Sequence, residues 1–242
     1  MTPDLQYLTV AATPWVSALF VGTTLLTAGL LVHSVRAAGL AVRPWLVGIG
    51  AWLTVQAVLA YLGFYQNLEP VPPRLLLFGI LPTMIVLGYL LISQSGRALI
   101  SRLPLAFLTT LSVVRVPVEI VLYALATQHL VPTLMSFEGY NFDILSGLTA
   151  PIIGYAYGRG NLGWRGLLAW HLLTLGLQLN IVELALWSAP SPLQRLAFDQ
   201  PNVAILQFPF VWLPSFVVPV VAFTHLVALR RLLAPRPSLA TT

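Results

Sequence analysis

The chain contains no cysteine and no lysine, and only 8% of its residues are charged. The absence of cysteine excludes disulfides, thiolate nucleophiles and cysteine metal ligands. The absence of lysine excludes a Schiff base and a phosphate-loop lysine. A soluble domain carries about 25% charged residues, whereas 58% of this chain is hydrophobic. Water is therefore a poor solvent for most of its surface, and we predict an integral membrane protein surrounded by the lipid bilayer.

The net charge of +5 does not indicate a nucleic-acid partner. The basic residues are all arginines, and they stand singly or in pairs at the ends of apolar segments rather than in one cluster. We therefore predict no binding to nucleic acid. The sequence does not indicate an oligomeric state.

Apolar runs long enough to cross a bilayer as helices occur seven times. They cover about residues 14–34, 45–66, 75–94, 105–128, 142–158, 166–187 and 206–229. The connections are short, and no change of composition marks a second domain. We predict an all-α fold, with residues 1–242 forming a single seven-helix transmembrane bundle.

The arginines are distributed unequally between the two ends of these runs. One set of connections and the C-terminal end contain nine arginines and no acid: Arg36, Arg43, Arg97, Arg102, Arg159, Arg165, Arg230, Arg231 and Arg236. The opposite set contains five acids and two arginines: Asp4, Glu69, Glu138, Asp143, Asp199, Arg74 and Arg195. The positive-inside rule predicts that the N-terminus is outside and the C-terminus is cytoplasmic. The long outer connections, 129–141 and 188–203, are predicted to fold over the outer mouth of the bundle.

The stretch "SVVRVPVEIVL" places charged residues inside the fourth apolar run. Arg115 and Glu119 are four residues apart and share one helical face with Ser112 and Tyr123. An arginine in mid-membrane costs about 2.5–3.5 kcal/mol, so this face is predicted to contact protein or trapped water. Pro117 is expected to kink the helix, because it lacks a backbone N–H.

Polar residues in the neighbouring runs are candidate partners for this face. The sixth run has polar residues on two opposite faces, which predicts a central position in the bundle. Glycines at 147, 154 and 158 predict that another helix approaches the fifth run closely. The residues that we predict to form a polar, outward-opening ligand pocket are Arg115, Glu119, Glu183, Asn180, Gln56, Asp143 and Tyr123.

A structural role for the same residues is the alternative interpretation. Arg115 is then expected to bridge Glu119 and Glu183 and to fix the packing of the helices. Asp143 is then expected only to stabilise the start of a helix.

Three histidines and the three prolines of the last run are further residues that could belong to a site. His33, His171 and His225 fall at similar depths, but no H-x-x-x-H pattern joins two of them on one face. Ordinary interfacial histidines are therefore favoured, and we predict no metal and no cofactor. The last run contains three prolines from Pro209 onward. They predict either a broken helix that lines the site or a helix that begins late.

The stretches "RVPVEIVLY", "FEGYNFDILSGLTAP" and "FDQPNVAILQFPFVWLP" resemble an uncharacterised family of bacterial polytopic membrane proteins. The similarity runs from about residue 110 to 232. The resemblance implies a bacterial inner (plasma) membrane setting, and it implies no particular activity.

Our first hypothesis is therefore a membrane protein that binds or transports a small molecule or ion. The alternatives are a membrane-embedded enzyme acting on a lipid or isoprenoid, and an accessory subunit of a larger membrane complex. The sequence does not decide whether the protein is an enzyme.

Overall fold

The computed structural model describes residues 2–234, which are helical with no strand, so the all-α prediction is confirmed for this part of the chain. The α-helices are α1 (Pro14–Ala37), α2 (Arg43–Tyr61), α3 (Leu81–Ile92), α4 (Gln94–Arg102), α5 (Leu105–Leu111), α6 (Arg115–Thr127), α7 (Asp143–Gly158), α8 (Trp164–Ser188) and α9 (Val218–Leu233). Two π-helical turns, η2 (Leu75–Ile80) and η6 (Leu213–Val217), lead into α3 and α9. The 3-10 turns are η1 (Phe64–Gln66), η3 (Ser112–Val114), η4 (Thr133–Met135) and η5 (Ala204–Leu206).

Six segments of the described chain are long and apolar enough to cross a membrane. They are Pro14–Ala37, Arg43–Tyr61, Leu75–Ile92, Leu105–Thr127, Trp164–Ser188 and Leu213–Leu233. The chain is therefore a multi-pass membrane protein. The fifth predicted run coincides with α7, which has 16 residues and is shorter than these six.

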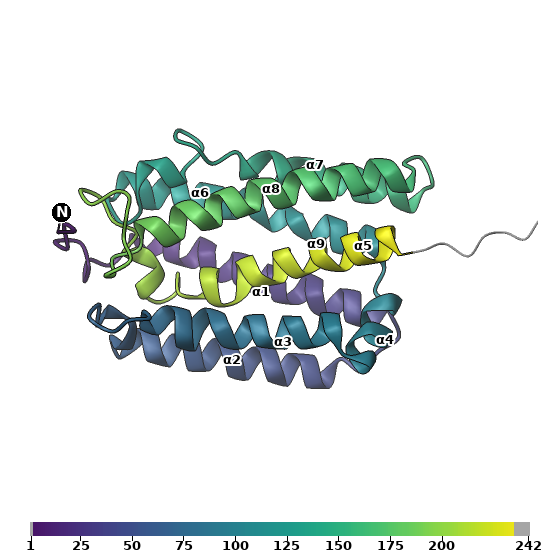
Figure 1. Ribbon diagram of the computed structural model, residues 1–242, viewed down its shortest axis with the longest axis horizontal. Helices are drawn as coiled ribbons and strands as arrows, with labels where there is room; N and C mark the ends of the chain where they lie inside the picture. Colours follow the sequence, from purple (N-terminus) through teal and green to yellow (C-terminus); the bar gives the residue numbers. More distant parts are fainter. Residues whose placement is uncertain (1, 235–242) are drawn as a thin grey trace, which may run out of the picture.

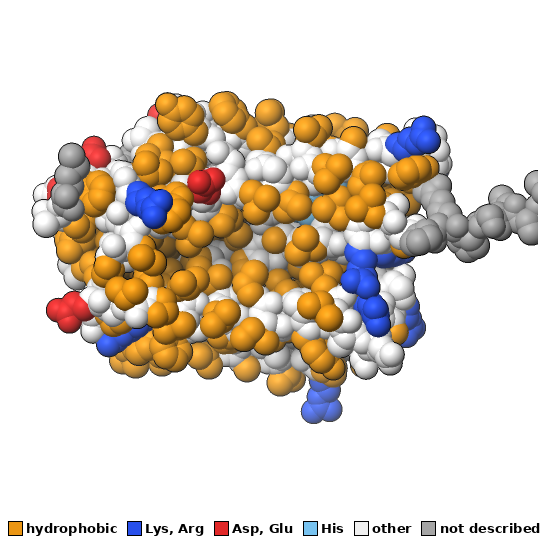
Figure 2. All heavy atoms as spheres, viewed as in Figure 1, with side chains coloured by type: hydrophobic (Ala, Val, Ile, Leu, Met, Phe, Trp, Pro, Cys, Tyr) orange, Lys and Arg blue, Asp and Glu red, His pale blue; other side chains and the backbone are white. Residues whose placement is uncertain are grey.

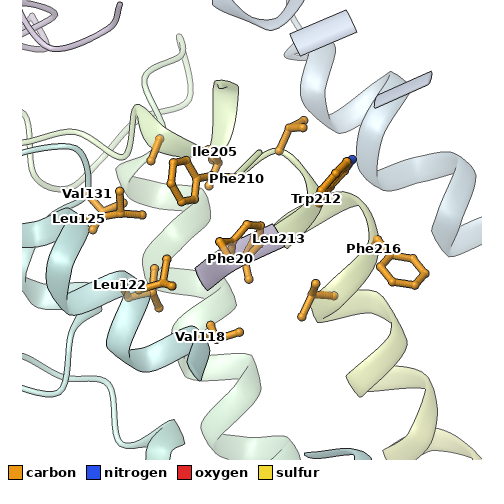
Figure 3. Close-up of a cluster of buried hydrophobic side chains, with 14 of the residues drawn as sticks. Phe20, Val118, Leu122, Leu125, Val131, Ile205, Phe210, Trp212, Leu213 and Phe216 are labelled. Atoms are coloured by element: carbon orange, nitrogen blue, oxygen red, sulfur yellow. The ribbon is translucent and has the colours of Figure 1, made fainter. Parts of the chain in front are cut away.

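The long helices lie side by side along the long axis of the molecule (Figure 1). In that view α2 and α3 form one side, α7 and α8 form the other, and α1 and α9 lie between them. Burial agrees with this arrangement, because 61% of the apolar stretch of the Leu213–Leu233 span, which contains α9, is buried, but only 11% of the Leu75–Ile92 span, which contains α3. Figure 3 shows part of the core, where Phe20 of α1, Leu122 of α6 and Phe210 before η6 gather.

The predicted central position of α8 is wrong. Its Thr174 and Gln178 face is buried, whereas Gly176, Asn180 and Glu183 are exposed. Asn180 and Glu183 lie in the last turns of the helix, where Asn180 donates to the Tyr140 carbonyl of the connection before α7 and Glu183 accepts from Trp187 of α8. Polar residues near the end of a membrane-spanning helix lie close to the polar interface, so they do not require that the helix be surrounded by protein.

The fourth span is interrupted at its charged segment, as Pro117 predicted. α5 ends at Leu111, a 3-10 turn covers Ser112–Val114, and α6 begins at Arg115. Pro117 has no N–H to donate to the carbonyl four residues earlier, and that carbonyl lies in the 3-10 turn. The interruption therefore lies one turn before the proline.

Gln56 supports α3 at another position where a proline removes a hydrogen bond. Pro82 has no N–H for the carbonyl of Phe78, and Gln56 Nε2 donates to that oxygen at 3.0 Å. The hydroxyl of Tyr65 donates to Gln56 Oε1 at 2.7 Å. Burial raises the pKa of Tyr65 to about 12, so this hydroxyl remains a donor at neutral pH.

The last span begins at Leu213 rather than near residue 206, as the late-start interpretation predicts. The π-helical turn η6 also interrupts the span before α9, and residues of both segments line a cavity, as the broken-helix interpretation predicts. Pro219 removes the usual partner of the Ser215 carbonyl. Trp52 Nε1 of α2 and Thr83 Oγ1 of α3 donate to that oxygen at 3.0 and 2.8 Å. These bonds attach α2 and α3 to the start of the last span.

The glycines of α7 allow the close helix contact that their spacing predicted. A Cβ atom at Gly154 would lie 2.8 Å from the carbonyl oxygen of Ala106 in α5. A Cβ atom at Gly147 would lie 2.8 Å from the backbone nitrogen of Val116 in α6. Because real Cβ atoms are not found so close to backbone atoms, only glycine fits at these two positions.

Two long connections, residues 129–141 and 188–212, fold together over one end of the bundle, and we call them the cap. The carbonyl oxygen of Leu130 accepts the backbone N–H groups of Val203 and Ala204 at 3.1 and 2.9 Å. All three residues are buried. The cap is therefore packed against the helices, as the sequence predicted.

Candidate functional site

Arg115 is the centre of a buried polar network and is only 3% exposed. Its Nη1 donates to Asp143 Oδ1 of α7 at 2.7 Å and to the Thr174 carbonyl of α8 at 3.1 Å. Its Nη2 donates to Gln178 Oε1 of α8 at 2.7 Å and lies 3.0 Å from His225 Nε2 of α9. The guanidinium of α6 is therefore attached to α7, α8 and α9.

Asn141 connects this ion pair to a second buried carboxyl group. Its Oδ1 accepts the backbone N–H of Asp143 at 3.0 Å, and its Nδ2 donates to Glu119 Oε1 at 2.5 Å. Asp143 lies in the first turn of α7, where an acid is expected, and it also pairs with Arg115. The helix-start interpretation of Asp143 is therefore correct but incomplete.

A hydrogen-bonded pair of histidines extends the network away from Arg115. A guanidinium only donates, so His225 Nε2 must accept and the hydrogen of His225 must be on Nδ1. His225 Nδ1 lies 2.7 Å from His171 Nδ1, and His171 Nε2 lies 3.1 Å from Thr109 Oγ1. Thr109 donates to the Leu105 carbonyl. One arrangement of hydrogens therefore satisfies the whole chain, with both histidines neutral.

A cavity of about 480 Å³ lies beside the network. Its walls come from η2 and α3, α6, α8, the cap, and η6 and α9, and most of the lining side chains are apolar. The charged lining residues are Arg74, Arg115, Glu119 and Asp143. Arg74 lies over the Phe64 ring at 4.7 Å and donates to the Phe64 carbonyl. The predicted polar pocket is thus a largely apolar cavity with a minority of polar side chains in its wall.

Two of these polar side chains have an atom without a hydrogen-bond partner among the described residues. They are Arg115 at Nε and Glu119 at Oε2. Arg115 and Glu119 are 3% and 1% exposed. An unpaired buried polar atom costs about 1–3 kcal/mol, so a partner supplied by a bound molecule would stabilise this wall.

Of the seven residues predicted to form the pocket, the structure brings Arg115, Glu119 and Asp143 together in the cavity wall. Arg115 pairs with Asp143, and its expected bridge to Glu119 and Glu183 is not among the ion pairs of the described residues. Glu183 is exposed and accepts a bond from Trp187 at 3.4 Å.

The other predicted pocket residues support the fold outside the cavity. Asn180 Nδ2 donates to the Tyr140 carbonyl at 2.9 Å, and Tyr123 stacks on Phe137 with ring centroids 4.8 Å apart. Both contacts hold the cap. Gln56 satisfies the carbonyl exposed by a proline in α3.

The predicted pocket took Asn180 and Glu183 from the other polar face of the sixth run, and so left out Gln178, Thr174, His171 and also His225, which belong to the arginine network. The first three lie on one face of α8 at helical spacing, and that spacing is visible in the sequence. What the spacing does not reveal is which of the two polar faces points toward Arg115.

The three histidines do not form one site. His171 and His225 are in contact, whereas His33 packs against the ring of Phe107. In residues 2–234 no group of three or more His, Cys, Asp or Glu side chains is placed to hold a metal ion.

Comparisons of the chain with protein-family models, with curated proteins and with solved structures find no match. Arg115 and Glu119, each with one unpartnered polar atom, line a cavity whose other lining side chains are mostly apolar.

Proposed function

We propose that this protein binds a small amphipathic molecule within the membrane, with the polar group at Arg115 and Glu119 and the apolar part in the cavity. One observation supports this most directly: two buried charged side chains with unpartnered atoms lie in the wall of a cavity of about 480 Å³. Ligand cavities commonly measure about 300–1,000 Å³, and ionisable residues inside a membrane usually belong to functional sites. Binding of this kind serves a transporter or a receptor.

We further propose that the chain crosses a bacterial inner membrane seven times, with its N-terminus outside. The crossing that we add to the six long apolar spans is α7. This helix is short, but it packs along α5. Figure 2 shows arginines mainly at one end of the bundle and acids mainly at the other. This distribution supports a cytoplasmic arginine-rich end. Arg236, one of the predicted cytoplasmic arginines, lies outside the described residues.

Single cysteines test this topology, because the chain has none of its own. Glu138 and Asn161 are exposed and lie on either side of α7. In intact cells a membrane-impermeant maleimide is expected to label Glu138→Cys, and to label Asn161→Cys only after permeabilisation. Labelling of both variants in intact cells would show that α7 does not cross.

Analysis of co-purifying lipids tests the binding proposal. Val182 lines the cavity, whereas Leu173 of the same helix is 72% exposed and does not. Mass spectrometry of an organic extract is expected to find one amphiphile near equimolar amount in wild type and in Leu173→Trp, and to find it depleted in Val182→Trp. Equal amounts in the two variants would contradict binding in the cavity.

A further inference from the structure

The cavity reaches the protein surface between α3 and α8. Met84 of α3 and Leu179 of α8 line the cavity, yet they are 39% and 60% exposed. Both residues lie well inside spans that are long enough to cross the membrane, so the opening faces acyl chains rather than water. Figure 2 shows the middle of this face covered mainly by hydrophobic side chains.

The cap covers the cavity on another side. Met135 and Leu206 of the cap line the cavity and are buried, whereas Leu193 of the cap also lines it and is 45% exposed. Backbone hydrogen bonds between the two halves of the cap hold it closed over the helices. Access from the bilayer between α3 and α8 therefore does not require these hydrogen bonds of the cap to open.

The charges in the cavity wall favour a neutral head group. Asp143 already neutralises Arg115 at 2.7 Å, and Glu119 adds a further carboxyl group to the same wall. A carboxylate or phosphate would lie beside Glu119, and an ammonium would lie beside Arg115. Each arrangement brings like charges together in a region of low dielectric constant.

A hydroxyl group matches the hydrogen-bonding character of both unpartnered atoms. Its oxygen can accept from Arg115 Nε, which is a donor, and its hydrogen can be donated to Glu119 Oε2, which is an acceptor. If Glu119 is protonated, the hydroxyl accepts from it instead. The match therefore does not depend on the charge state of Glu119.

We infer that the ligand is a hydroxyl-headed amphiphile with an apolar tail, and that it enters laterally from the bilayer between α3 and α8. This inference rests on the proposed function and adds the chemical class of the ligand and its path.

The test uses wild-type protein in liposomes that contain one of three diazirine-bearing probes: hexadecanol, palmitic acid or hexadecylamine. After irradiation, the labelled peptides are mapped by mass spectrometry. Hexadecanol is expected to label cavity-lining peptides about tenfold more than either charged probe, which corresponds to about 1.4 kcal/mol. Excess unlabelled hexadecanol is expected to remove this labelling. The charged probes also report binding of an acid at Arg74, the other cavity-lining arginine.

The results separate the inference from the proposed function. Equal labelling of the cavity by palmitic acid or hexadecylamine overturns the hydroxyl assignment and leaves the proposed function intact. Absence of cavity labelling by all three probes overturns both.

The path is tested with Leu179→Trp, which narrows the opening, and Leu173→Trp as the control on the exposed face of α8. Leu179→Trp is expected to slow hexadecanol labelling about tenfold without changing its final extent. This corresponds to a free-energy barrier to ligand entry that is about 1.4 kcal/mol higher. Circular dichroism and gel filtration confirm that each variant is folded. An unchanged initial rate in folded Leu179→Trp overturns access between α3 and α8.

Discussion

The ion pair between Arg115 and Asp143 predicts a large and strongly non-additive effect on stability. Both residues are buried, and their atoms are 2.7 Å apart. In Asp143→Asn the guanidinium keeps neutral acceptors but loses its counter-ion. Breaking a buried pair by removing one partner costs about 3–5 kcal/mol. We expect a loss of about 3 kcal/mol, because Gln178, His225 and the Thr174 carbonyl still accept from the guanidinium.

Arg115→Met is expected to cost a similar amount, since it leaves Asp143 buried without its partner. The double variant Arg115→Met/Asp143→Leu removes both charges. Gln178 and His225 then lose a donor, although hydrogen bonds between helices in membranes average only about 0.6 kcal/mol. The double variant should therefore lose less than the sum of the single variants, with a coupling free energy of about 2–3 kcal/mol.

The free energy of unfolding is measured by titrating detergent-solubilised protein with sodium dodecyl sulfate, followed by circular dichroism. Glu183→Gln is the matched control, because it removes an exposed carboxylate with the same change of atoms, and it is expected to change stability by no more than about 0.5 kcal/mol. Additive single variants, or a loss in Asp143→Asn no larger than in the control, would refute a buried pair at this position.

Two further predictions concern the scaffold around the site. Gly154→Leu forces a side chain against the Ala106 carbonyl and is expected to destabilise the protein by about 1–3 kcal/mol in the same titration. Gly176→Leu is the control, because there is open space where its Cβ atom would lie. Equal losses of stability in the two variants would contradict the close packing of α5 and α7. Gln56→Leu leaves the hydroxyl of Tyr65 and the carbonyl of Phe78 without these partners, and it is expected to lower the free energy of unfolding by about 1–3 kcal/mol. An unchanged free energy of unfolding would show that these groups find other hydrogen-bond partners.

The positions of the membrane spans were accessible from sequence because the bilayer fixes the length of an apolar helix. α1, α2 and α8 lie within a few residues of the predicted runs. The start of the last span was predicted too early, because residues 206–212 are themselves mostly apolar. In that segment the prolines, not the hydropathy, decide where the helix begins.

Arg115 was identifiable because a charge inside an apolar run requires a polar environment. Its partner was not, because pairing with Asp143 depends on the rotation of α7 about its axis. Glu183 has the same side-chain chemistry as Glu119 but lies on the exposed face of α8. Residue type and helical spacing do not distinguish these two cases.

The cavity itself could not be predicted from sequence for a similar physical reason. Leucines and valines that face a cavity, a helix or lipid are the same residue types, since all three environments are apolar. Leu179 and Val182 line the cavity, yet nothing in their sequence context separates them from the exposed Leu173.

The most direct test of the proposed site is an electron-density or cryo-EM map of the protein extracted together with its native lipids. We predict elongated density that fills the cavity from the opening at Leu179 to hydrogen-bonding distance of Arg115 Nε and Glu119 Oε2. A map in which neighbouring side chains fill the cavity, or in which protein groups alone satisfy these two atoms, would contradict a ligand site in this membrane protein.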